Sequence, residues 1–144
     1  MQVTIHTTNE LHDWVYSFVH TLNQRNQATI VTLSGDLGAG KTTCVQYIAR
    51  VLGIDEPITS PTFVIQKEYP VFGHDWITRL VHIDAYRLED KNQLEYLGWQ
   101  HLVDDPHTLI CIEWPEMVSG IAIPDALQIT FSLQDSNTRL LTVV

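Results

Sequence analysis

The chain has 144 residues, of which 44% are hydrophobic and 17% are charged, and its formal net charge is −9. This composition is typical of a globular protein and excludes a disordered or fibrous one. The length suits one compact domain spanning residues 1–144 and is short for two. The acidic balance argues against strong direct binding to nucleic acid, because an acidic surface repels phosphate backbones.

Signals for membrane insertion or export are absent from the sequence. No apolar stretch reaches the length that crosses a bilayer, and residues 1–10 lack the basic segment and long apolar core of a secretory signal. Cys44 and Cys111 each lie in an apolar segment, so we interpret them as buried free thiols, with a disulfide or a metal pair as the alternatives. We therefore expect a cytoplasmic protein that does not contact a membrane.

The first predicted elements are a strand and a helix. Residues 3–5 could form a short edge strand. Thr7 followed by Glu10 has capping-box spacing, in which the hydroxyl accepts a hydrogen bond from the first helical turn. Apolar residues then recur at helical spacing, namely Leu11, Trp14, Val15, Phe18 and Leu22. This pattern predicts an amphipathic helix that ends near residues 23–26.

A second strand and a second helix follow, with a glycine-rich loop between them. Residues 28–34 form a β-branched apolar run, which is typical of a strand buried on both faces. Residues 41–52 have a helical pattern that Gly53 ends. The loop therefore joins the carboxyl end of a buried strand to the start of a helix.

This loop matches a nucleotide-binding pattern. Gly35, Gly40, Lys41 and Thr42 satisfy G-x-x-x-x-G-K-[ST] in the strand–loop–helix context that the pattern requires. Glycines let backbone N–H groups approach phosphate oxygens, and the start of the helix adds partial positive charge. Lys41 would then bind the β- and γ-phosphates, and Thr42 would ligate Mg²⁺. The alternative is a flexible turn that contains a lysine by chance.

The rest of the chain alternates predicted strands with short helices. Residues 58–63 should form a loop, because Pro61 has no N–H and restricts the residue before it. The later elements are strands at 63–69 and 77–84, short helices within 88–103, a strand at 108–114, and a hairpin of 125–133 and 139–144. This order predicts an α/β fold: a single P-loop NTPase-like domain with a mixed central sheet, parallel core strands, flanking helices and an antiparallel hairpin. The apolar strands 28–34 and 108–114 should lie near its centre.

Two carboxylates end apolar runs. Glu113 is the first acid after residues 109–112, where P-loop proteins place a carboxylate that binds Mg²⁺ through water or polarises the attacking water. A helix-capping or surface glutamate is the alternative. Asp84 ends another apolar run and is a second candidate, with capping of the next turn as its alternative. His82 alternates with Asp84 on one strand face, and we interpret it as a structural hydrogen-bonding residue.

The loop beyond the second helix carries several hydroxyls. Thr59, Ser60 and Thr62 lie one helix after the glycine-rich loop. Nucleotide switches place a loop at this point to sense the γ-phosphate. The alternative is a rigid turn without such a role.

Five segments, in their order and spacing, resemble the TsaE (YjeE) family: GDLGAGKTT, SPTF, HIDAYRL, LEYLG and IEWPE. The members of this family are bacterial P-loop ATPases required for threonylcarbamoyladenosine modification of tRNA. The resemblance implies that Mg²⁺ is held by Thr42 and Glu113. It also implies an ATP site formed by Gly38, Ala39, Gly40, Lys41, Thr42 and Thr43.

The resemblance implies further roles. Lys41, Asp84 and Glu113 would take part in catalysis, and residues 60–63 would act as a switch. The nucleotide side of the site would include Thr8 to Leu11, Ser60, Thr62, Trp114 and Arg139. Family members act with two other subunits that form the tRNA threonylcarbamoyl transferase, and ATP hydrolysis resets that complex. The same partners are therefore expected for this chain.

Three other functions are compatible with a P-loop. A small P-loop metabolite kinase needs several arginines in one loop to clamp its second substrate, and the sequence has no such cluster. A GTPase needs an Asn-Lys-x-Asp segment, which is also absent. A nucleotide-gated binding module without useful turnover remains the non-enzyme alternative.

Overall fold

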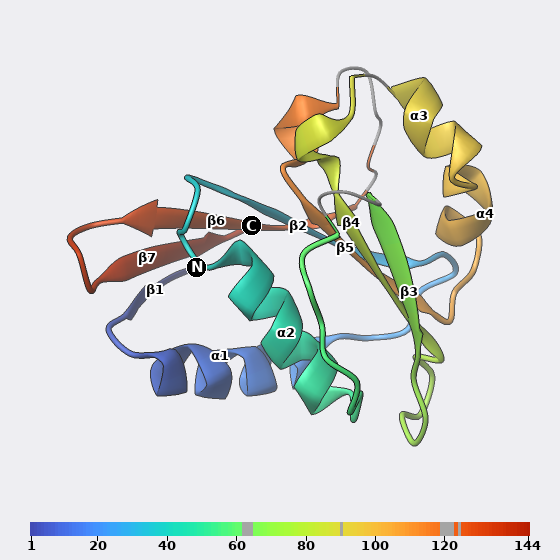
Figure 1. The fold of residues 1–144 in the computed structure, drawn as a ribbon. Helices are drawn as coiled ribbons and strands as arrows, with labels where there is room; N and C mark the ends of the chain where they lie inside the picture. The colour runs from blue at the N-terminus through green and yellow to red at the C-terminus, as the bar shows by residue number, and fades with distance from the viewer. Residues whose placement is uncertain (62–64, 90, 119–122, 124) are drawn as a thin grey trace.

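A computed structural model describes residues 1–61, 65–89, 91–118, 123 and 125–144 of the protein. Its strands form a seven-stranded sheet in the order β1-β7-β6-β2-β5-β4-β3 (Figure 1). The strands are β1 Gln2–Ile5, β2 Thr29–Gly35, β3 Gln66–Pro70, β4 Arg79–Asp84, β5 Thr108–Glu113, β6 Leu127–Leu133 and β7 Arg139–Val143. The helices are α1 Thr8–Thr21, α2 Lys41–Val51, α3 Lys91–Tyr96 and α4 Trp99–Val103, with 3₁₀ turns η1 Ala85–Arg87 and η2 Pro115–Met117.

The middle of the sheet is parallel and its two sides are antiparallel. Strands β6, β2, β5 and β4 run in one direction. The β6–β7 hairpin and β1 complete one side, and β3 completes the other. The predicted mixed α/β sheet with parallel core strands and an antiparallel hairpin is thus confirmed. The two strands predicted to lie near the centre, β2 and β5, are neighbours there, and every residue of β5 is buried.

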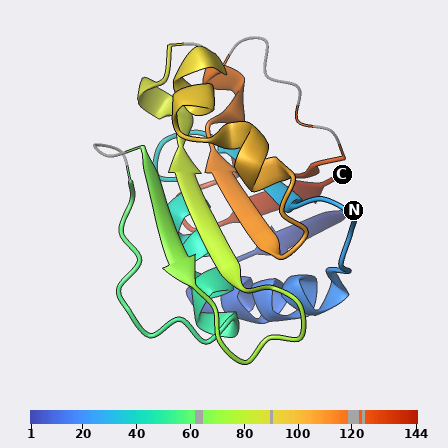
Figure 2. The same ribbon diagram turned by 90° about the vertical axis from the view of Figure 1, so that its right-hand side faces the viewer.

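Helices cover both faces of the sheet. In Figures 1 and 2, α1 and α2 lie against one face, and α3 and α4 lie on the opposite side beside β4 and β5. The two faces bury separate hydrophobic clusters. The α1–α2 side contains Leu33, Ile48 and Leu109, and the other side contains Ile30, Ile83 and Leu102. Both sides of β2 and β5 are therefore covered, as a parallel strand requires.

The first helix begins where the capping-box spacing predicts. The backbone N–H of Glu10 donates to Thr7 Oγ1 at 3.1 Å, and Thr7 has extended backbone angles. The Glu10 carboxylate in turn accepts a hydrogen bond from the His6 N–H at 2.7 Å. These bonds satisfy amide groups that the helix itself leaves without acceptors. They also place the start of α1 beside the end of β1.

The parallel strands bring the predicted site residues to one edge of the sheet. Leu33 of β2 and Asp84 of β4 both pair with Glu113 of β5, so the carboxyl ends of the three strands coincide. Ligands of open α/β sheets bind outside this edge. Because the glycine-rich loop follows β2 directly, the topology places it beside both carboxylates.

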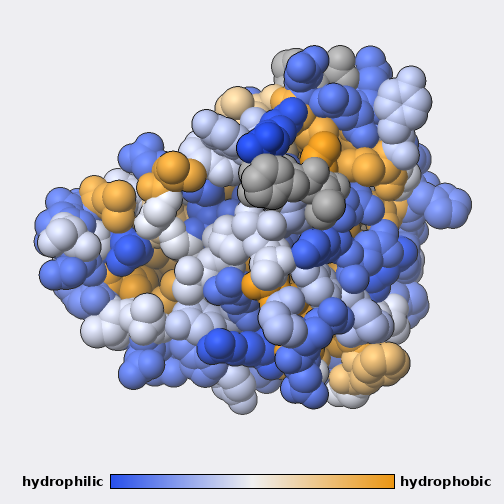
Figure 3. Space-filling view, viewed as in Figure 1, coloured by the Kyte–Doolittle hydropathy of each residue, from blue (hydrophilic) through white to orange (hydrophobic). Residues whose placement is uncertain are grey.

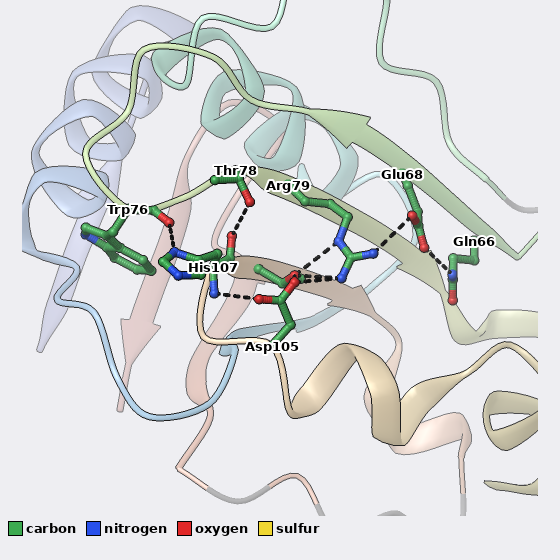
Figure 4. Close-up of polar contacts among 8 residues, drawn as sticks. Gln66, Glu68, Trp76, Thr78, Arg79, Asp105 and His107 are labelled. Atoms are coloured by element: carbon green, nitrogen blue, oxygen red, sulfur yellow. Dashed lines mark hydrogen bonds and ion pairs between the residues drawn. The ribbon is translucent and has the colours of Figure 1, made fainter.

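A different polar cluster lies at the opposite end of β4 and β5 (Figure 4). The Arg79 guanidinium lies 2.8 Å from Asp105 Oδ2 and 3.5 Å from Glu68 Oε2, and it donates to Thr108 Oγ1. Burial raises the pKa of the Asp105 carboxyl, but hydrogen bonds and the Arg79 charge together lower it below its usual value. The cluster ties β3, β4 and the loop before β5 together, and we assign it a structural role.

The face drawn in Figure 3 mixes polar and apolar residues. On the face in Figure 3, exposed apolar residues form separate clusters among hydrophilic ones, without one continuous patch. Within the described ranges, no helix combines the length and the apolar character needed to cross a bilayer.

Candidate functional site

The backbone of the glycine-rich loop adopts angles that are strained for any residue with a side chain. Gly35, Gly38 and Gly40 have φ values of 136°, 75° and 112°, which favour glycine. Gly35 also lies against β6, where an added Cβ would overlap the Phe131 carbonyl oxygen and come within 3.0 Å of the Phe131 Cβ. Glycine is therefore required at position 35 both for its backbone angle and for its lack of a side chain.

Replacing Gly35 with alanine should destabilise the fold by at least about 3 kcal/mol, since backbone strain and overlap with a strand add together. Gly98→Ala is the matched control. Its φ is 81°, but a Cβ there meets open space, so it should cost only about 1–2 kcal/mol. Urea unfolding of both variants measures the difference. Equal losses of stability would contradict the role of the close approach to Phe131.

The N-terminus of α2 is open toward the loop. Its N-cap, Gly40, has no side chain to accept hydrogen bonds from the first turn, so this end keeps the partial positive charge of uncapped N–H groups. Arg139 of β7 supports the loop from the side, because its Nε donates to the Ala39 carbonyl at 2.9 Å. A helix N-terminus of this kind is suited to bind an anion.

Lys41 lies folded into the loop that precedes it. Its Nζ donates to the carbonyl oxygens of Gly35 at 2.7 Å and Asp36 at 2.8 Å. The same ammonium lies 4.0 Å from the centre of the Trp114 ring, a cation–π contact. Burial lowers the pKa of the ammonium, while nearby carboxylates, Glu113 foremost, oppose that shift. The site therefore contains a buried cation with only backbone oxygens as hydrogen-bond acceptors in the described residues.

Glu113 connects the helix to the strands. Thr42 Oγ1 donates to its carboxylate, at 2.7 Å from Oε1 and 3.0 Å from Oε2. On the other side, His82 Nε2 lies 2.5 Å from Glu113 Oε2. Glu113 is only 2% exposed, and these two side chains hold its carboxylate. The alternative of a surface glutamate is wrong.

Asp84 caps the turn that follows it, which was the alternative to a catalytic role, and it also contacts the Ser60 loop. Its Oδ1 accepts the N–H of Tyr86 at 3.0 Å and so caps the 3₁₀ turn η1. Its Oδ2 accepts the Ser60 hydroxyl at 3.2 Å. Asp84 thereby links the end of β4 to the loop that follows α2. Thr62 and Phe63, the rest of the predicted switch, lie outside the described residues.

Trp114 departs from the prediction. The sequence pattern includes it in the strand 108–114, but β5 ends at Glu113 and Trp114 adopts a left-handed conformation with φ 59° and ψ 48°. This conformation is costly for a bulky residue, and more so before a proline such as Pro115. It turns the ring toward Lys41 and toward Tyr86, whose ring centre lies 5.1 Å away.

A cavity of about 510 Å³ lies over this edge of the sheet, a volume typical of small-ligand sites. The predicted residues that line it are Gly38, Gly40, Lys41, Thr42, Thr43, Ser60, Asp84, Glu113, Trp114 and Arg139. Thr8 and Leu11, from the segment expected on the nucleotide side of the site, line it as well. Ala39 is fully buried, and the Gly35 carbonyl instead accepts a hydrogen bond from Lys41.

Comparison with known families decides the relationship. The profile of the family described as threonylcarbamoyl adenosine biosynthesis protein TsaE matches residues 5–141. The chain belongs to the TsaE family. This confirms the resemblance seen in the sequence motifs.

Individual TsaE relatives agree with this family. The chain is 33% identical to the tRNA threonylcarbamoyladenosine biosynthesis protein TsaE of Rickettsia felis over 80% of its own length, but only 64% of that protein's length. It is 29% identical to the Rickettsia typhi protein of the same name, over 97% of this chain and 92% of that protein. The crystal structure of Bacillus subtilis YdiB superposes with a TM-score of 0.76 and 25% identity, covering 99% of this chain and 83% of that one.

Sequence reasoning missed several residues of the TsaE cavity. Tyr86 and Arg87 line it from η1, and the signal that could have found them is their position directly after the strand-end Asp84. Ser136 and Asn137 line it from the turn between β6 and β7. The sequence predicts the turn but no local pattern marks it as part of a site, because the hairpin reaches the cavity only through its pairing with β2 and β1.

The two cysteines are free and buried, as predicted. Burial, together with the charge of Glu113, raises the pKa of the Cys44 thiol to about 12. Burial also raises the pKa of Cys111 well above its usual value. In the part of the chain that the structure describes, no group of three or more His, Cys, Asp or Glu side chains could hold a metal ion.

Both thiols should therefore resist modification at pH 8, because the reactive thiolate forms only above their raised pKa values. A thiol-specific reagent should label neither cysteine in the folded protein and both in concentrated urea. Labelling of Cys44 or Cys111 at the rate of a free peptide would contradict the burial of that residue.

Proposed function

We propose that this chain binds ATP and Mg²⁺ in the cavity and hydrolyses the ATP in the cytoplasm, as one P-loop ATPase domain serving threonylcarbamoyladenosine modification of tRNA. The observation that carries this proposal is the meeting of the Lys41 loop, Thr42 and Glu113 at one point of a cavity of suitable size. The family and the names of the relatives support the link to tRNA modification.

The phosphates would be held by the glycine-rich loop and the start of α2. A triphosphate carries several negative charges, and the loop offers a buried ammonium and an uncapped helix N-terminus. To reach the phosphates, Lys41 would exchange its bonds to the Gly35 and Asp36 carbonyls for bonds to phosphate oxygens. Charge-assisted bonds of this kind are stronger than those to neutral carbonyls.

The residues at the end of β5 fit Mg²⁺. Thr42 and Glu113 supply hydroxyl and carboxylate oxygens, the ligands that Mg²⁺ prefers, and both line the cavity. Bound there, Mg²⁺ would neutralise charge that develops on the phosphates. In the structure the Thr42 hydroxyl donates its hydrogen bond to the Glu113 carboxylate. With Mg²⁺ bound to the Thr42 oxygen, this hydrogen bond would have to turn to another acceptor.

Asp84 and Glu113 are the groups placed to orient the attacking water. Their positions pair across β4 and β5, and both side chains line the cavity. A carboxylate can accept a proton from water as the water adds to the γ-phosphorus and the bond to the β-phosphate breaks. The surrounding burial strengthens each of these interactions.

The output would be a change of shape read by partner proteins. Ser60 hydrogen-bonds Asp84 and lines the cavity, so its loop is placed to respond to the γ-phosphate. The partners proposed are the two other subunits of the tRNA threonylcarbamoyl transferase. Direct tRNA binding should be weak, given the net charge of −9.

The test is to measure the affinity of the chain for the transferase subunits with a hydrolysis-resistant ATP analogue, with ADP and without nucleotide. Affinities that differ between the analogue and ADP support the switch, because a ligand shifts an equilibrium only by its differential affinity. Equal affinities in all three states would rule the switch out.

Nucleotide-dependent partner binding without any ATP hydrolysis would favour the binding-module alternative. Tight, salt-sensitive tRNA binding by the isolated chain would overturn the charge argument.

A further inference from the structure

His82 contacts the candidate site from inside the core. Its side chain is fully buried, and its Nε2 lies 2.5 Å from Glu113 Oε2. The contact crosses two adjacent parallel strands diagonally, since His82 of β4 pairs with Cys111 of β5 and Asp84 pairs with Glu113. Glu113 lines the cavity, so the histidine reaches the cavity only through this carboxylate.

The contacts of the His82 ring show which of its two nitrogens carries the donated hydrogen. A carboxylate oxygen only accepts hydrogen bonds, so Nε2 must be the donor. His82 Nδ1 is buried without a hydrogen-bond partner in the described residues. A hydrogen on Nδ1 would be a buried donor without an acceptor, whereas a bare lone pair is tolerated more easily. The geometry therefore assigns the donated hydrogen to Nε2 and leaves Nδ1 without one.

The two oxygens of Glu113 have unequal surroundings. Oε2 lies 2.5 Å from His82 and 3.0 Å from Thr42 Oγ1, while Oε1 lies 2.7 Å from Thr42 Oγ1. The histidine thus holds Oε2 toward the core. Among the described residues, the hydrogen-bond partner of Oε1 is Thr42, the proposed magnesium ligand in the first turn of α2.

We propose that His82 is a positioning residue that fixes the rotation of the Glu113 carboxylate and keeps Oε1 available to the site. This inference rests on the proposed ATPase function. The sequence interpretation of His82 as a structural hydrogen-bonding residue is thereby extended, because its partner is the carboxylate expected to act on Mg²⁺ or water. Groups that orient a ligand from behind commonly change metal affinity or activity by about 10–100-fold when removed.

Two substitutions separate positioning from packing. His82→Leu fills the space but donates no hydrogen bond, and it should lower kcat about tenfold or more, with the ATP KM changed less than about threefold. His82→Gln should restore most of kcat, because its amide N–H can reach the same oxygen. Titration calorimetry should also show weaker dependence of ADP binding on Mg²⁺ for His82→Leu than for the wild type.

A double-mutant cycle supplies the control. In a Glu113→Ala background, His82→Leu should cause little further loss of kcat, because the residue acts through that carboxylate. Additive losses would indicate an independent structural role and overturn the inference. A His82→Leu chain that is folded and turns over ATP at the wild-type rate would overturn it as well.

Nitrogen NMR of the wild-type chain tests the contact without any activity measurement. The His82 ring should show a protonated Nε2 and a bare Nδ1, and this signature should change in Glu113→Ala. A hydrogen on Nδ1, or no change in that variant, contradicts the inference even where hydrolysis is normal. A wild-type chain that binds no nucleotide instead overturns the proposed function, and the positioning role with it, whatever the NMR shows.

Discussion

Replacing Lys41 with alanine should weaken ATP binding by at least about a hundredfold, which corresponds to ~2.7 kcal/mol. The substitution removes the full positive charge that the glycine-rich loop supplies. Bonds from charged groups contribute about 1.5–3 kcal/mol each, and Lys41 can reach more than one phosphate oxygen. The start of α2 would remain, so residual binding is expected. Titration calorimetry with a hydrolysis-resistant ATP analogue measures the loss.

Arg50→Ala is the matched control for this prediction. It removes a cation from the same helix, but from the exposed last turn, where the guanidinium lies 5.4 Å from the Tyr47 ring centre. Its ATP affinity should stay within about twofold of the wild type, since Arg50 is exposed and lies roughly 13 Å along the helix from Lys41, beyond the screening length of physiological salt. A folded Lys41→Ala chain with unchanged affinity would refute the assignment of the loop to phosphate.

Replacing Glu113 with alanine should reduce ATP hydrolysis by at least about a hundredfold, while nucleotide affinity falls much less. The carboxylate would act through Mg²⁺ or the attacking water, and both interactions matter most in the transition state. Glu113→Gln keeps the shape of the side chain but loses its charge and replaces one accepting oxygen with an NH₂ donor, so kcat should fall nearly as far. Steady-state hydrolysis with the partners present, alongside calorimetry, separates the two effects.

The neighbouring carboxylates provide the comparison. Glu116 is exposed and hydrogen-bonds Ser34, so Glu116→Gln should leave kcat within about twofold, as surface changes usually do. Asp84→Ala should lower kcat in the same way as Glu113→Ala, because it lines the same cavity. If either Glu113 or Asp84 can be removed without loss of turnover in a chain that circular dichroism shows folded, that carboxylate is structural.

The sequence alone predicted the parts of the fold that depend on local pattern. The motif around Lys41 occurs between a strand and a helix, so it predicted β2, the loop and α2 together. Glu113 could be picked out as the first acid after an apolar run, because such a run in an α/β chain is a central parallel strand. The carboxyl ends of parallel strands share an edge, so the meeting of these residues was also predictable.

Contacts that depend on register could not be predicted. The bond between His82 and Glu113 requires the alignment of β4 against β5, and nothing in either segment fixes that alignment. The turn at Trp114 depends on tertiary contacts that outweigh its backbone cost. Asn137 reaches the cavity because the β6–β7 hairpin pairs with β2 and β1 within the sheet. In each case the information lies in the packing of distant segments.

We propose that ATP binds in the cavity at the carboxyl ends of β2, β4 and β5, and amide NMR of the labelled chain can locate the bound nucleotide. On titration with ADP or an ATP analogue and Mg²⁺, the largest shifts should fall on Gly38, Gly40 and Lys41. A second cavity of about 710 Å³, lined by residues including Arg25 and Asp125, serves as the internal comparison and should not respond. Shifts confined to that second cavity, or no shifts at millimolar nucleotide, would contradict the account.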